Sequence, residues 1–93
     1  MKKRAFVPHA LERIVKGFSN HRRIQVLSIL DGEPQLSLDE ITDRTHINYK
    51  TASEHVRRLA LSGLVYKRSD SHSVRHVLSA RGKQVLKFLR TLE

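Results

Sequence analysis

The short segment Thr45–Ile47 limits what this 93-residue chain can fold into more than any other feature of its sequence. Before it, Ser37-Leu38-Asp39-Glu40 matches a capping box, in which a serine and a glutamate satisfy each other's backbone donors at a helix start. After it, Asn48 is a good cap for another helix. Because so few residues allow only a turn, we expect helices over about 38–45 and 48–62 to form a helix pair.

The second helix of this pair is predicted to be amphipathic. At about 100° per residue, its apolar side chains gather on one side and its polar side chains on the other. The inward set is Ala52, Val56, Leu59 and Ala60, and the outward set is Lys50, Ser53, Glu54 and Arg57. Gly63 can adopt the left-handed conformation that ends this helix.

Further elements are predicted on both sides of the pair. Apolar spacing indicates a helix over 9–18 that Pro8 helps to begin, and a second helix that starts at Ser19 or Asn20. In the helix that starts at Ser19 or Asn20, the apolar stripe is Ile24, Leu27 and Leu30, and this helix ends near Asp31-Gly32. Leu36 adds a single strand-like residue before the capping box.

Two strand-like runs and a final helix complete the pattern. The runs 64–68 and 74–78 flank a polar tip, Ser69–Ser73, which predicts a hairpin, and Ser79 caps a last helix over 80–92. The predicted fold class is mainly α with a small β-hairpin, in the order α-α-α-α-β-β-α. The length suits one domain over residues 1–93.

The charge of the chain points to a polyanionic partner. Eighteen Lys and Arg residues stand against nine Asp and Glu residues, which gives a formal charge of +9, and the pI is near 10.7. Nearly all of the excess lies between Arg44 and Arg90, whereas residues 31–43 carry acids only. We therefore expect one cationic side, with a merely solvated basic surface as the alternative.

Residues 20–86 resemble a winged helix-turn-helix of the ArsR/MarR transcription-regulator type. The resemblance rests on three segments that occur in order, "NHRRIQVLSIL", "SLDEITDRTHINYKTASEHVRRLALSGLV" and "HVLSARGKQVL". It implies a double-stranded DNA partner, a recognition helix over 48–62 and a hairpin that acts as the wing. By the same analogy, the chain is predicted to be a transcriptional repressor.

The candidate DNA-binding residues follow from the outward face of the helix over 48–62. The amino-terminal half of a recognition helix enters the major groove, so the expected base readers are Tyr49, Lys50, Thr51, Ser53 and Glu54. Phosphate contacts are expected from Arg57 and Arg58, and Asn48 either caps the helix or also binds a phosphate. On the wing, His72 and Arg75 are candidates for the adjacent minor groove. Arg22 and Arg23 either touch phosphates or pair with the acids of residues 31–43.

Self-association is predicted from the two helices that flank the motif. Their apolar residues exceed what a small core requires, which favours a homodimer; the alternative is that they only cover the core of the monomer. The predicted interface residues are Leu11, Ile14, Val15, Phe18, Val85, Phe88, Leu89 and Leu92.

No catalytic residue, metal ligand or cofactor is predicted. The chain has no cysteine, and its six histidines lack the spacing of a zinc site. It also lacks a glycine-rich phosphate loop and the common hydrolase motifs. The alternatives to a sequence-specific regulator are a winged-helix module for protein or RNA and a non-specific architectural DNA binder.

The predicted location is the cytoplasm, without a membrane partner. No apolar run approaches the roughly 20 residues that cross a bilayer. Met1–Arg4 is basic, but neither a long apolar stretch nor a small-residue cleavage site follows it.

Overall fold

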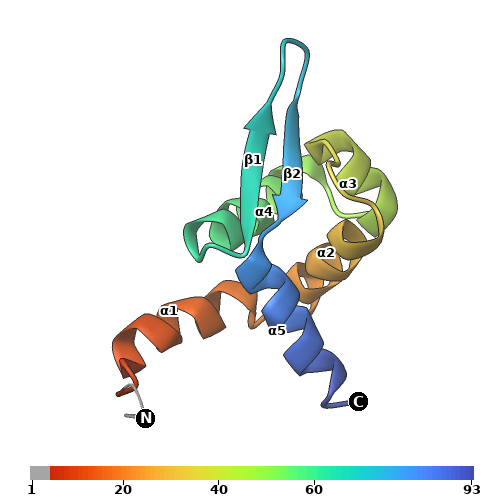
Figure 1. Ribbon diagram of the computed structural model, residues 1–93. Helices are drawn as coiled ribbons and strands as arrows, with labels where there is room; N and C mark the ends of the chain where they lie inside the picture. The colour runs from red at the N-terminus through yellow and green to blue at the C-terminus, as the bar shows by residue number, and fades with distance from the viewer. Residues whose placement is uncertain (1–4) are drawn as a thin grey trace.

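The computed structural model describes residues 5–93, so Met1–Arg4 and the prediction based on them lie outside the described residues. The fold class and the order of elements are confirmed (Figure 1). The elements are α1 (Pro8–Phe18), α2 (His21–Gly32), α3 (Leu38–Thr45), α4 (Tyr49–Leu61), β1 (Val65–Ser69), β2 (Val74–Leu78) and α5 (Ala80–Arg90). The hairpin points away from the body on one side, and α1 and α5 diverge from it on the other (Figure 1).

Polar caps set the starts of four helices. Asn20 Oδ1 accepts hydrogen bonds from the amides of Arg22 and Arg23 at 2.9 and 3.2 Å. Asn48 and Ser79 cap α4 and α5 in the same manner. At α3 both bonds of the predicted capping box are present: the Ser37 amide donates to Glu40 Oε1 at 3.0 Å, and the Glu40 amide donates to Ser37 Oγ at 3.2 Å. These short-range signals explain why the predicted helix starts are accurate.

Two details of the predicted elements are wrong. The last helix ends at Arg90 rather than residue 92, because the amides of Thr91 and Leu92 bond to carbonyls three residues earlier and tighten the chain. In α2, Ile24 is only half-buried, whereas Val26 is fully buried. Since α2 contacts α3, α4, α5 and β2, it buries more than the single stripe that its sequence suggested.

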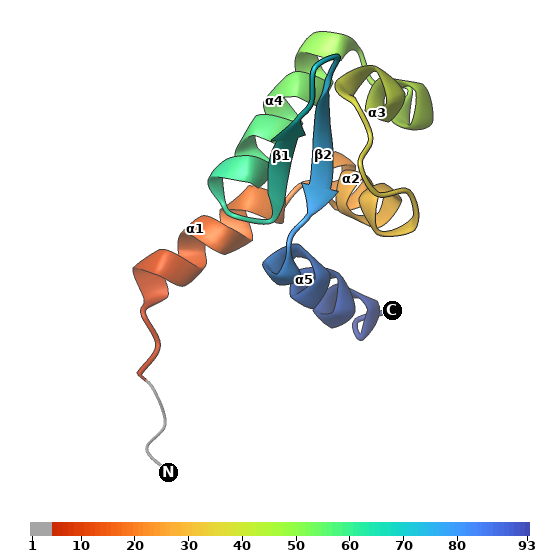
Figure 2. The same cartoon turned by 45° about the horizontal axis from the view of Figure 1, so that its top comes forward.

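The core lies between α2, the helix pair and the base of the hairpin (Figure 2). Its side chains come from every element except α1, and α1 packs against it through Ile14 and Phe18. The buried apolar residues are Val26, Leu27, Leu30, Leu36, Ile41, Ala52, Val56, Leu59, Leu64, Val65, Leu78 and Leu86.

Leu36 and His76 attach the hairpin to the loop before α3. In the antiparallel hairpin, Val65 pairs with Leu78 and Ser69 with Val74. Leu36 forms an isolated bridge to His76, which confirms the predicted strand-like residue. The Leu36 carbonyl accepts hydrogen bonds from the His76 amide at 2.8 Å and from the His76 ring Nδ1 at 2.9 Å, so Nδ1 carries a proton. Burial lowers the pKa of His76, with a smaller contribution from Lys67, against the opposing effect of the Leu36 bond.

This pKa shift predicts that acid weakens the fold. The unfolded chain takes up a proton at His76 near pH 6.5, whereas the folded chain resists it, so the free energy of unfolding should fall as pH decreases from about 7.5 to 5.5. Urea denaturation at both pH values measures this. His76→Gln keeps a donor for Leu36 and should reduce the pH dependence, whereas His72→Gln, at the exposed tip, should not. Equal pH dependence in all three proteins would contradict the assignment.

Gly82 allows α5 to lie directly against the hairpin. A Cβ at this position would overlap the Leu64 carbonyl oxygen and lie 2.6 Å from Leu78 Cδ1. Gly82 is itself buried near the start of α5. A side chain here would therefore force the helix and the hairpin apart.

We predict that Gly82→Ala lowers the free energy of unfolding by about 1 to 3 kcal/mol, the usual cost of overpacking. Thermal denaturation followed by circular dichroism measures the loss. The matched control is Gly32→Ala in α2, where a Cβ would have no neighbour within 4 Å and the helix propensity improves. The control should be neutral or slightly stabilising; equal destabilisation of both variants would show that close packing is not the cause.

Candidate nucleic-acid interface

The outward face of α4 is exposed as predicted. Lys50, Ser53, Glu54 and Arg57 are open to solvent, whereas Ala52, Val56 and Leu59 are buried. The turn before α4 uses a feature that the sequence did not reveal: His46 caps α3 in the left-handed conformation, with φ of 58°. A left-handed conformation is uncommon outside glycine, although histidine adopts it more often than most residues, and here it ends α3.

The first turns of α4 carry the predicted base readers. Tyr49, Lys50, Ser53 and Glu54 line a shallow hollow of about 530 Å³ beside the exposed face. Thr51 is exposed, but it lies outside this hollow. Asn48 accepts a 2.9 Å bond from the Thr51 amide, so it caps the helix and its side-chain oxygen is already used.

Glu54 forms ion pairs with both arginines that were assigned to phosphates. Arg57 donates to its two carboxylate oxygens at 2.6 and 2.9 Å, and Arg58 Nε donates at 3.2 Å. The Arg57 hydrogen bonds, together with the charges of both arginines, lower the pKa of Glu54 to about 2. The same pairing raises the pKa of Arg57. Glu54 and Arg57 are therefore both ionised at neutral pH.

The two predicted wing residues lie in different places. His72 is exposed at the tip, where its amide and that of Ser73 bond to Asp70 Oδ1 at 2.8 and 2.7 Å. Arg75 is turned toward α3: its guanidinium donates to Glu40 at 2.8 Å and to the Gln35 carbonyl at 3.3 Å, and its Nε donates to Ser73 Oγ at 3.1 Å. The register of β2 turns Arg75 toward α3, an outcome that depends on how the hairpin packs.

Two further cations on the wing were not selected from the sequence. Lys67 and Arg68 on β1 are exposed, and no ion pair involves them among residues 5–93. Their position in a predicted hairpin after a helix-turn-helix was the available signal. They add positive charge along the strand that lies beside α4 (Figure 2).

Arg22 and Arg23 do not pair with the acids of residues 31–43, so that alternative is wrong. Arg22 donates to Gln25 at 3.0 Å and to the Thr45 carbonyl at 3.4 Å. Arg23 turns toward α1 and α4, where it contacts the Lys16 carbonyl at 3.3 Å and His55 Nδ1 at 3.5 Å. Burial and the neighbouring Arg23 lower the pKa of His55.

The acids of that region bind other arginines instead. The pairs are Arg44–Glu33 at 2.9 Å, Arg75–Glu40 at 2.8 Å and Arg90–Asp31 at 3.1 Å. Arg75 and Arg90 are 35 and 59 positions away from their acids in the sequence, and the fold brings each arginine to its partner.

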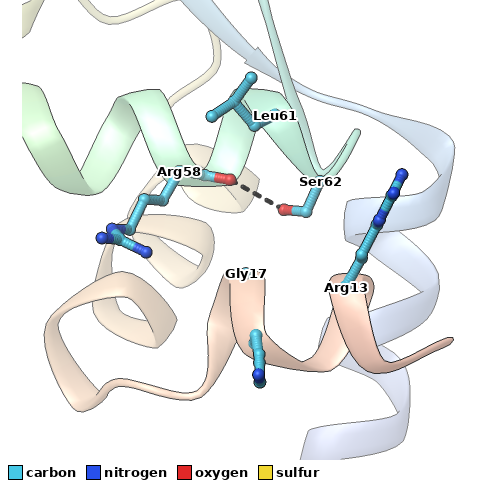
Figure 3. Close-up of a pocket in the computed structure, with 6 residues that line it drawn as sticks. Arg13, Gly17, Arg58, Leu61 and Ser62 are labelled. Atoms are coloured by element: carbon cyan, nitrogen blue, oxygen red, sulfur yellow. Dashed lines mark hydrogen bonds between the residues drawn. The ribbon is translucent and has the colours of Figure 1, made fainter. Parts of the chain in front are cut away.

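A second hollow, of about 240 Å³, lies between α1 and the end of α4 (Figure 3). Arg13 and Arg58 flank it, and Ser62 Oγ donates to the Arg58 carbonyl at 3.0 Å. Gly17 permits the close approach, since a Cβ there would overlap the Ser62 side chain. Arg58 thus lies between the outward face of α4 and this hollow.

The predicted dimer residues divide into two groups. Ile14, Phe18 and Val85 pack against the core of the same chain, and Leu89 is half-buried. The other four remain exposed: Leu11 by 44%, Val15 by 50%, Phe88 by 56% and Leu92 by 66%. Half of the predicted set is therefore available for another molecule, while the other half stabilises the monomer.

Among residues 5–93, no three His, Asp or Glu side chains lie close enough together to hold a metal ion. None of the described helices is long and apolar enough to cross a membrane.

Comparison with known proteins places this arrangement in a family. Residues 17–75 match the model of the MarR family. The transcriptional activator HlyU of Vibrio cholerae is 34% identical over 68 residues, which cover 72% of this chain and 61% of that protein. The matched segment thus spans less than two thirds of that relative.

Solved structures agree with the fold. A structure of HlyU from Vibrio cholerae has a TM-score of 0.79 and 28% identity, and it covers 91% of this chain and 92% of that one. The homodimeric winged helix-turn-helix DNA-binding domain of a possible ArsR-family regulator from Mycobacterium bovis has a TM-score of 0.82 and 21% identity, with 99% and 89% covered. Because the family model matches well over half of its residues, the chain belongs to the MarR family of winged helix-turn-helix transcriptional regulators.

Proposed function

We propose that the chain is a homodimeric regulator that binds specific double-stranded DNA sequences, with α4 in the major groove and the hairpin at the flanking groove. The observation that carries this proposal is the exposed polar and cationic face of α4 opposite its buried apolar face. A helix is about 10 to 12 Å across, and the major groove is about 12 Å wide. The face of α4 therefore suits base edges in that groove.

The residues of α4 divide by their distance from its start. Tyr49, Lys50 and Ser53 are exposed in the first turns, where side chains reach bases. Lys50 can donate to guanine, and the hydroxyl of Ser53 can bond to several bases. Arg57 and Arg58 lie further along, where phosphates are the nearer partners. These roles give one segment for sequence reading and another for affinity.

On the wing, we propose His72 at the tip together with Lys67 and Arg68 as the groups that approach DNA. All three are exposed on one hairpin. Arg75, the other wing residue predicted from the sequence, would first have to leave Glu40 to reach DNA. The ion pair gives Arg75 a clear structural task, the attachment of the hairpin to α3.

A homodimer is proposed through α1 and α5. These helices extend on the side away from the hairpin tip (Figure 1) and carry the exposed residues Leu11, Val15, Phe88 and Leu92. The similar domain from Mycobacterium bovis is described as homodimeric. Two-fold symmetry would place the two α4 helices about 34 Å apart, one turn of DNA, and would favour a palindromic site.

We further propose a cytoplasmic repressor, in which the bound dimer blocks access of polymerase to the promoter. The similar HlyU is named an activator, so the direction of regulation needs its own measurement. A reporter gene behind the selected DNA site decides it: deletion of the regulator should raise expression under repression and lower it under activation.

Selection of bound fragments from random duplex DNA tests the proposal, and alanine variants test the surface. We expect Arg57→Ala/Arg58→Ala to weaken binding to duplexes of any sequence and to reduce the slope of log affinity against log salt by up to about 2 units. Fluorescence anisotropy at several salt concentrations measures both effects. The charge-matched control is Lys83→Ala/Lys87→Ala on exposed positions of α5, which should change the slope much less.

The outcomes separate the competing functions. Binding without any enriched sequence would indicate an architectural DNA binder. Absence of duplex binding even at low salt would refute the proposed function and favour a protein or RNA partner.

The dimer is tested with Phe88→Asp. A carboxylate in a desolvated apolar interface is costly, so this variant should run as a monomer in light scattering while its circular dichroism stays native. Lys87→Asp places the same acid on the neighbouring polar position and should leave the dimer intact. A Phe88→Asp protein that remains dimeric would reject this interface.

A further inference from the structure

Glu54 has a contact pattern that base reading alone does not explain. It lies on the outward face of α4, yet its carboxylate accepts three hydrogen bonds from Arg57 and Arg58, at 2.6 to 3.2 Å. Oε1 accepts from both arginines and Oε2 from Arg57. In the free protein, the acid and both proposed phosphate contacts thus form one exposed cluster, which we call the Glu54 cluster.

A docking duplex would compete with Glu54 for the arginines of the Glu54 cluster. The Nε and Nη2 groups of Arg57 that bind Glu54 form the same fork that binds a phosphate in a bidentate manner. Arg57 cannot present this fork to both anions at once. If phosphates take the arginines, the Glu54 carboxylate loses its donors and faces a polyanion, which is unfavourable unless a new donor replaces them.

Base edges differ in whether they supply that donor. In the major groove, cytosine offers its N4 amino group, to which Glu and Asp pair, whereas guanine offers the acceptors N7 and O6 and thymine the acceptor O4. Adenine also offers an amino group, N6, but the acceptor N7 lies beside it. A carboxylate next to an acceptor gains no hydrogen bond and meets repulsion. The release of Glu54 is therefore most favourable opposite cytosine, less favourable opposite adenine and unfavourable opposite guanine or thymine.

We infer that Glu54 determines specificity by exchanging partners: it holds Arg57 and Arg58 in the free protein, yields them to phosphates on DNA, and is then satisfied by a cytosine amino group. This inference rests on the proposed function and adds a reason why non-matching DNA is bound weakly. On such DNA, the cost of the unpaired carboxylate opposes the phosphate contacts of both arginines.

Glu54 also positions Arg58. The Arg58 side chain borders the hollow between α1 and α4 that Arg13 flanks from the other side (Figure 3). This hollow gives Arg58 room to lie away from the outward face. The 3.2 Å bond from its Nε to Glu54 holds it on the side of α4 that carries Arg57.

The experiment is a double-mutant cycle on duplex binding, read by anisotropy with the selected site and with a scrambled duplex. Glu54→Gln keeps the shape but removes the charge that holds the arginines. We expect affinity for the scrambled duplex to rise about three- to tenfold, and the ratio of specific to scrambled affinity to fall about tenfold, chiefly at cytosine positions. In the Arg57→Ala/Arg58→Ala background, the gain on scrambled DNA should shrink to less than about twofold.

Glu12→Gln removes an equal charge from an exposed acid of α1, whose partner Lys16 lies 3.9 Å away, and should leave the affinity ratio unchanged. An equal gain from Glu54→Gln with and without the arginines would show simple charge repulsion and overturn the exchange. An unchanged affinity ratio would overturn it as well. If the wild-type protein binds no duplex at all, the proposed function itself fails, which is a distinct result.

Discussion

Burial of one side of α4 is the interaction on which the rest of the structure depends. Ala52, Val56 and Leu59 are fully or almost fully removed from water against α2 and the neighbouring elements. Because a helix turns about 100° per residue, this burial leaves the opposite side free along its whole length. The cationic face exists as a continuous surface only because the apolar face fixes the rotation of α4 about its own axis.

The surface so formed is not a simple collection of positive charges. Glu54 gathers Arg57 and Arg58, Arg75 binds Glu40, and Arg23 is turned inward against α1 and α4. Several arginines that appear free in the sequence therefore already have partners. Each would have to exchange one partner for another to bind DNA, so the net charge of +9 overstates the positive charge that is immediately available.

Local chemistry explains which predictions succeeded. The caps Asn20, Ser37, Asn48 and Ser79 act on amides two or three residues away, so sequence alone locates these helix starts. Gly63, with φ of 75°, ends α4 for an equally local reason. The spacing of its apolar residues predicts which side of α4 is buried. The interpretation of the elements as a helix-turn-helix followed by a wing came from the family resemblance. The burial of Ile24 and the partners of Arg22 and Arg23 were predicted wrongly because they depend on contacts between distant segments. The end of the last helix was missed by two residues for a local reason, the bonds from the amides of Thr91 and Leu92 to carbonyls three residues earlier.

The sequence by itself determined the order of elements, their starts and the polar face of α4, because these depend on neighbours within a few residues. Only the tertiary structure decided that Arg75 binds α3, that Leu36 and His76 attach the hairpin, and which apolar residues of α1 and α5 remain exposed. Those outcomes join residues up to 40 positions apart, as in the bond between Leu36 and His76. Their geometry is set by how whole elements pack, and no local pattern encodes it.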